Sequence, residues 1–155
     1  MARQTGTVRL YLPATLAEVD ARPAPLAPRP AHAVTPDLRA AFPEEDEEGW
    51  EFVAQSAAAE DSVRRQGAED VPLRLVLVAE VPAAHVRPAA GGEASAVELA
   101  AEVSWDDVVC LLVDEPEAAA EVRAAREGEA GALAALEERD LLWYDVTEAG
   151  DVPRP

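Results

Sequence analysis

A few polar residues in this sequence have types and positions that could support acid–base or anion-binding chemistry. His32 precedes Thr35-Pro36, a pair typical of a helix start, where backbone N–H groups can hold an anion. Arg39 follows one turn into that helix, and Asp145 lies in a late strand pattern. One hypothesis is a small-molecule or catalytic pocket in which His32 serves as acid or base, Asp145 orients it and Arg39 clamps an acidic group.

Three further side chains could contribute ligand contacts to such a pocket. Tyr11 and Thr15 flank the end of the first strand pattern, and Tyr144 directly precedes Asp145. The same residues also have an ordinary structural interpretation. A histidine before a helix start is commonly a hydrogen-bonded structural residue, and Arg39 with Asp145 can form a structural ion pair.

Trp105 and Trp143 are the candidates for a protein interface. A tryptophan on a strand or turn most often packs in the core or at a sheet edge. An exposed tryptophan can instead anchor a protein–protein contact.

Several chemistries require residues that the sequence lacks. There is no lysine, which excludes a Walker A loop, a Schiff base and a lysine general base. The single cysteine, Cys110, and two distant histidines cannot build a structural zinc site. No GxGxxG follows a strand and no GxSxG is present. We therefore expect no metal and no cofactor, and the sequence favours a non-enzymatic function.

The charge is strongly acidic, with 31 acidic residues against 13 arginines and a formal net charge of −18. Such a field disfavours nucleic acids and anionic membranes as partners and favours a basic protein surface. An acidic surface can also simply keep an Ala-rich protein soluble, and genomic composition can raise the acidic content further. A third possibility is that regularly spaced carboxylates imitate DNA. The pattern carries no signal for an oligomeric state.

The N-terminal residues lead directly into a strand pattern, without the features of a secretory signal. No apolar stretch approaches the roughly 20 residues that a membrane span needs. Cys110 lies in an apolar run, as inert packing thiols do. These features predict a cytoplasmic protein.

Apolar alternation predicts about five strands, at 7–12, 71–81, 97–103, 108–113 and 141–147. Helices are expected to start at Thr35, to run from the acidic segment 44–48 to Gln66, and to occupy 116–128 and 132–139. Neighbouring strands without an intervening helix favour antiparallel pairing. The predicted fold is α+β, mainly an antiparallel sheet of about five strands with helices packed on one face, broadly ferredoxin-like.

We expect one domain over residues 1–155, with an ordered core at about 7–147. Residues 1–6 and 148–155 are expected to fray, and residues 22–30, with four prolines, to form a surface loop.

Three segments resemble a family of uncharacterised actinobacterial proteins, a domain of unknown function. They are Val8-Arg9-Leu10-Tyr11-Leu12-Pro13-Ala14-Thr15, Ala31-His32-Ala33-Val34-Thr35-Pro36 with Leu38-Arg39, and Leu141-Leu142-Trp143-Tyr144-Asp145-Val146-Thr147. The resemblance implies a bacterial source and a cytoplasmic location but no activity. The leading hypothesis is therefore a non-enzymatic cytosolic domain that binds a basic protein through its acidic surface. The pocket around His32, Arg39 and Asp145 is the alternative.

Overall fold

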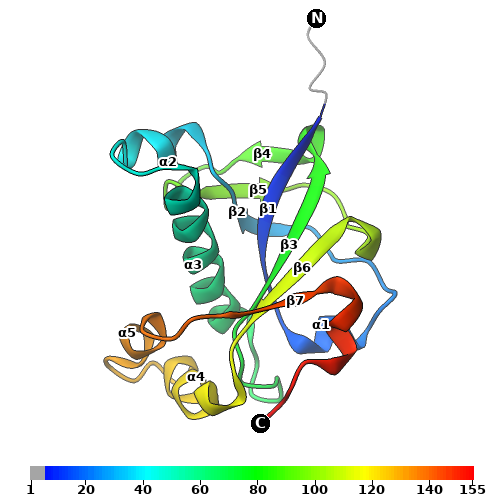
Figure 1. Ribbon diagram of the computed structural model, residues 1–155, viewed down its shortest axis with the longest axis vertical. Coiled ribbons are helices and arrows are strands. Elements are labelled where there is room, and N and C mark those ends of the chain that lie inside the picture. The colour runs from blue at the N-terminus through cyan, green and yellow to red at the C-terminus, as the bar shows by residue number, and fades with distance from the viewer. Residues whose placement is uncertain (1–5) are drawn as a thin grey trace, which may run out of the picture.

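The computed structural model describes residues 6–155, and the strands of this part of the chain form one antiparallel sheet in the order β4-β5-β2-β1-β3-β6-β7. Figure 1 shows that β4 and β5 run across the direction of β1 and β3, so the sheet curls. The strands are β1 Thr7–Ala14, β2 Arg29–His32, β3 Leu75–Pro82, β4 Val86–Pro88, β5 Ala96–Leu99, β6 Val108–Val113 and β7 Leu142–Asp145.

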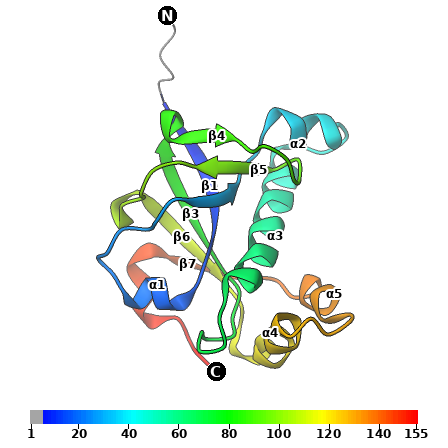
Figure 2. The same cartoon turned by 180° about the vertical axis from the view of Figure 1, so that it is seen from behind.

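The helices cover both faces of this sheet, as Figures 1 and 2 show from opposite sides. They are α1 Leu16–Asp20, α2 Pro36–Ala41, α3 Glu47–Arg65, α4 Ala119–Arg126 and α5 Ala132–Glu137, with short 3-10 helices at Ala83–His85, Trp105–Asp107, Pro116–Ala118 and Val146–Asp151. Within residues 6–155, no helix combines the length and the apolar character that crossing a membrane requires.

The larger core lies on the face of the sheet that α1 and the C-terminal segment cover. Alternation in β1 places Leu10 and Leu12 on this face, where both are fully buried. Leu16 of α1 and Val152 of the C-terminal segment close the same cluster. β1 is the central strand because it pairs with β3 over its whole length, from Thr7↔Pro82 to Ala14↔Leu75, and with β2 on its other side.

The opposite face of the sheet is covered by α3. Asp46 caps this helix by accepting a hydrogen bond from the Gly49 N–H at 2.9 Å. Ala54, Ala58 and Ser62 follow at four-residue spacing and are fully buried, so small side chains bring the helix close to the sheet. The Ser62 hydroxyl donates to the Ala14 carbonyl at 2.8 Å and accepts from the Leu75 N–H at 3.0 Å. This hydroxyl therefore joins α3 to β1 and β3.

The α+β class is confirmed, but the expected count of about five strands is wrong. β2 overlaps the end of the segment 22–30 that was expected to be a surface loop, and β4 lies between two predicted strands, where no strand was expected. Pro30 lies opposite Glu98 of β5, and β2 pairs with β1 only at Tyr11↔His32, so the ladder on that side of β2 is short. The helices do not share one face, and a ferredoxin-like arrangement is not confirmed.

The C-terminal segment packs onto the core instead of fraying from residue 148. Ala149 is 1% exposed and Val152 is 6% exposed, and Arg154 forms an ion pair with Asp20 of the first helix. The expected loop at 22–30 is also partly structured, because Leu26 is buried and pairs with Val103. Residues 1–5, which cover most of the expected N-terminal frayed segment, lie outside the described residues.

Candidate functional site

His32 is buried, and both of its ring nitrogens have partners. Nε2 lies 2.7 Å from Oδ2 of Asp61 on α3, and Nδ1 lies 2.8 Å from the Ser95 hydroxyl just before β5. Because a carboxylate can only accept, Nε2 carries a proton and donates to Asp61. The hydrogen bond from His32, reinforced by Arg64, outweighs the effect of burial and holds the pKa of Asp61 below its usual value of 3.8.

Ser95, His32 and Asp61 thus have the residue types of a serine nucleophile, a base and an orienting carboxylate. The exposure of the serine decides between a catalytic and a structural role. Ser95 lines the groove described below but is only 1% exposed, and His32 is 3% exposed, so almost none of the surface of the serine is accessible to a substrate. We therefore interpret this chain of hydrogen bonds as a connection between β2, α3 and the segment that enters β5.

The structure does not bring Asp145 or Arg39 to His32. Asp145 caps the following 3-10 helix, where its carboxylate accepts hydrogen bonds from the N–H and the hydroxyl of Thr147. These hydrogen bonds hold the pKa of Asp145 below its usual value. Arg39 lies on α2, pairs with Glu47 at 2.9 Å, and has its guanidinium 4.7 Å from the centre of the Trp50 ring. The orienting carboxylate of His32 is Asp61.

The three remaining ligand candidates are distributed over both faces of the sheet. Tyr11 is buried on the α3 side, and burial raises its pKa to about 12. Tyr144 packs against the core on the opposite side. Thr15 caps α1 and shares a capping box with Glu18. They do not converge on one pocket.

The two tryptophan candidates differ in their exposure. The Trp105 indole N–H donates to the Ala24 carbonyl at 3.0 Å, and the ring packs against the larger core. Trp143, on the edge strand β7, is 61% exposed. Trp143 therefore has the exposure that an interface requires, whereas Trp105 holds the proline-rich segment in place.

A groove of about 930 Å³ passes over the outer side of α3. Figure 1 shows α2 and α5 beside opposite ends of this helix. Phe52, which lies in the groove, is 59% exposed, and Phe42, at the end of α2, is 38% exposed. The large apolar lining residues are Leu38, Phe42, Phe52, Val53, Leu133, Leu136 and Leu141.

Carboxylates give the groove its negative charge. Its acidic lining residues are Glu60, Glu93, Glu137, Glu138 and Asp140. Glu60 pairs with Arg64, whereas none of the other four forms an ion pair within residues 6–155. The two arginines that line the groove, Arg74 and Arg139, are both neutralised by acidic partners.

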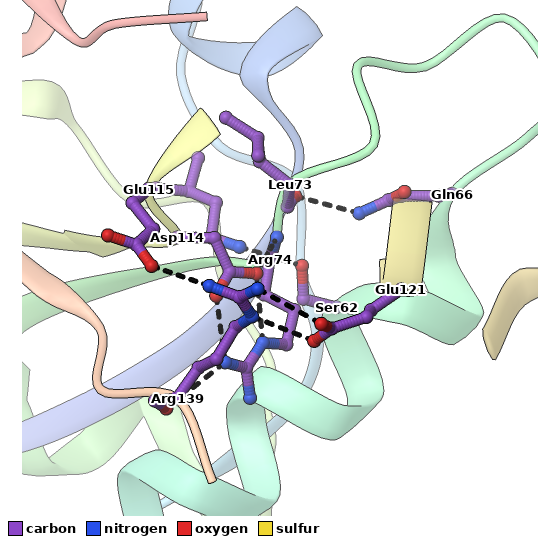
Figure 3. A network of polar contacts seen from close by, with 9 residues as sticks. Ser62, Gln66, Leu73, Arg74, Asp114, Glu115, Glu121 and Arg139 are labelled. Atoms are coloured by element: carbon purple, nitrogen blue, oxygen red, sulfur yellow. Dashed lines mark hydrogen bonds and ion pairs between the residues drawn. The ribbon is translucent and has the colours of Figure 1, made fainter. Parts of the chain in front are cut away.

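Figure 3 shows how these two arginines are held. Arg74 donates to both carboxylate oxygens of Asp114, at 2.9 and 2.8 Å, and both side chains are buried. Arg139 pairs with Glu115 and with both oxygens of Glu121, and its carbonyl accepts from Arg74. The network joins the start of β3, the end of β6 and the two C-terminal helices. The guanidinium charges of both arginines are therefore neutralised by carboxylates of the same chain.

In the described part of the chain, no three His, Cys, Asp or Glu side chains gather closely enough to hold a metal ion. Every buried polar side-chain atom there also has a hydrogen-bond partner. The exposed aromatic residues and the carboxylates of the acid-lined groove make it the candidate site of residues 6–155.

Sequence reasoning did not identify the residues that make up this groove or the partners of His32. Phe52 gave one usable signal, because this aromatic residue lies off the face of its helix that Trp50, Val53 and Ala57 share. Asp61 and Ser95 gave none, because they lie 29 and 63 residues from His32 and meet it only through the fold.

The chain belongs to a family of unknown function, DUF6912, whose model matches residues 8–152. No curated protein and no solved structure matches it.

Proposed function

We propose that this protein is a non-enzymatic cytosolic domain that binds another protein through the acid-lined groove over α3. One observation carries the proposal: the groove combines exposed aromatic side chains with carboxylates that have no internal partner, while its arginines are neutralised. An apolar segment with basic residues would satisfy both properties.

Three classes of partner fit the groove less well. Nucleic acids and anionic membranes are disfavoured by a net charge of −18. A small-molecule site normally encloses most of its ligand. Here Phe52 is 59% exposed on the outer side of a helix, an arrangement that suits a larger partner surface.

The aromatic part of the proposal is tested with two matched variants. Tagged wild-type protein, Phe52→Ala and Val109→Ala are used to capture proteins from a lysate of the native host, followed by mass spectrometry. Val109 is also an exposed apolar residue, at 38%, but it does not line the groove. We expect one partner that Phe52→Ala loses and Val109→Ala keeps. A partner captured equally by all three proteins would contradict the proposed site.

The charged part is tested in the same assay. Glu137→Gln with Glu138→Gln removes two charges from the groove, and Glu98→Gln with Glu102→Gln removes two exposed charges elsewhere. Capture should weaken in the first variant, persist in the second, and decrease as salt is raised, because exposed charges are screened over about 8–10 Å at ordinary ionic strength. Salt-independent capture would count against an acidic docking surface.

A further inference from the structure

The carboxylates of the groove occur at both of its ends. At the α2 end, Glu93 lies in the segment before β5, which is attached to the start of α2 by a hydrogen bond from Thr35 to the Ala94 carbonyl. A smaller adjoining concavity, which shares Phe52 and Val53 with the groove, is lined by four acidic residues, Glu45, Asp46, Glu48 and Glu51. This end therefore offers at least two acidic side chains to an occupant.

The α5 end carries a second acidic group. Glu137 is the last residue of α5, and Glu138 and Asp140 follow in the connection to β7. All three side chains are exposed. Arg139, which lies between them in sequence, is bound by Glu115 and Glu121, so it does not cancel their charge.

Between the two acidic ends, the lining contributed by α3 contains mainly uncharged side chains. Phe52, Val53 and Ser56 belong to this section, and its one carboxylate, Glu60, is paired with Arg64. The section from Phe52 to Glu60 spans about 12 Å at 1.5 Å per helical residue. The middle of the groove is thus about two helical turns long.

The elements that line the groove determine how an occupant is recognised. All of its lining residues come from helices or connecting segments, and none lies within a strand. An added strand would need a free sheet edge with available backbone groups, which this groove does not provide. Recognition therefore depends on side chains, as it does for a helix bound in a groove.

Building on the proposed function, we infer that the occupant is an amphipathic helix of a partner protein, with an apolar face of about two turns and basic residues beyond both ends of that face. The helix lies along α3. Its apolar residues contact Phe52 and its neighbours, one basic end faces Glu48 and Glu93, and the other faces Glu137, Glu138 and Asp140.

Two synthetic peptides of equal composition test this inference by fluorescence anisotropy. The two-ended peptide carries leucines at positions i, i+3, i+4 and i+7, with two arginines beyond each end. The one-ended peptide carries all four arginines beyond one end. We expect the two-ended peptide to bind roughly two- to ten-fold more tightly, because an exposed ion pair contributes about 0.2–1 kcal/mol.

Variants of each end sharpen the test. Glu48→Gln with Glu93→Gln, and separately Glu137→Gln with Glu138→Gln, should each weaken the two-ended peptide several-fold, whereas Glu98→Gln with Glu102→Gln should change its affinity less than two-fold. Circular dichroism confirms that each variant is folded.

The outcomes separate this inference from the proposed function. Equal affinity for the two peptides, or no binding of the two-ended peptide, overturns the inference. If Phe52→Ala still loses the partner captured from lysate, the proposed function survives that result. Undiminished binding of the two-ended peptide to Phe52→Ala would place the peptide outside the groove and overturn the inference directly.

Discussion

At the scale of single residues, the His32 ring connects three segments that are distant in sequence. Its hydrogen bonds to Asp61 and Ser95 satisfy polar atoms in a region where water is excluded. A buried polar group left without a partner costs about 1–3 kcal/mol, which is more than a formed hydrogen bond contributes. Removing the ring should therefore affect stability more than removing an exposed histidine.

We expect His32→Ala to lower the free energy of unfolding by about 2–4 kcal/mol, because it removes buried volume and leaves Ser95 without its partner. Urea denaturation measures this difference. His85→Ala is the matched control, since His85 is only half-buried, and should change stability by less than about 0.5 kcal/mol. Similar values for the two variants would contradict the structural role of His32.

The raised pKa of the Tyr11 phenol predicts that the protein loses stability at alkaline pH. Burial raises its pKa from 10.0 to about 12, so the folded state favours the neutral phenol. The resulting stabilisation is fully present below pH 10 and is lost as the pH rises from 10 towards 12. Tyr11→Phe should lose less stability than the wild type over this interval in pH-dependent thermal melts. Parallel curves for the two proteins would contradict the prediction.

At the scale of elements, the sequence indicated best those segments whose residues alternate or carry standard caps. The bounds of β1 and β6 lie within two residues of those predicted. Thr35 caps α2 as expected, and its hydroxyl accepts a hydrogen bond from the Leu38 N–H. β2 was missed because Pro30 suggests a loop, and tertiary pairing with β5 and, at one position, with β1 makes the segment a strand.

The buried side of α3 was also predicted incompletely. The predicted apolar face of this helix comprised Trp50, Val53, Ala57 and Val63. Val63 is buried, whereas the other three residues are half-buried. The residues in full contact with the sheet are small, and the serine among them, Ser62, satisfies its hydroxyl within the fold. Side-chain size and a tertiary hydrogen bond determine which side of α3 faces the sheet. Hydrophobic periodicity encodes neither of them.

The pair between Arg74 and Asp114 should be essential to how the C-terminal helices attach to the sheet. Asp114→Ala leaves the buried Arg74 guanidinium without its carboxylate, and we expect a loss of about 3–5 kcal/mol in urea denaturation. Asp20→Ala, which breaks the exposed pair with Arg154, should cost less than about 1 kcal/mol. The opposite ranking would contradict this assignment.

At the scale of the whole molecule, most of the charge is not balanced by ion pairs, since 31 acidic residues face 13 arginines. Self-repulsion of a large net charge destabilises a compact state. The sequence established this charge, but only the fold shows that carboxylates gather around exposed aromatic residues in one groove.

We expect the melting temperature to rise by several degrees between 10 mM and 500 mM NaCl, because salt screens the net repulsion. A neutral osmolyte at matched osmolality controls for general solute effects. A falling melting temperature would show that the local ion pairs contribute more than the net repulsion.

The central position of β1 has a consequence for the order in which the chain folds. β1 pairs with β3, whose residues lie more than 60 positions later, whereas β3, β6 and β7 are connected by shorter segments. Closing a long loop costs conformational entropy before the contacts it permits can form. The C-terminal strands should therefore assemble first and β1 dock late, giving folding on the millisecond-to-second scale typical of sheets with distant pairings. Until β1 arrives, the apolar edge of β3 is open to pairing with other chains, which makes this interval the point at which aggregation competes with folding.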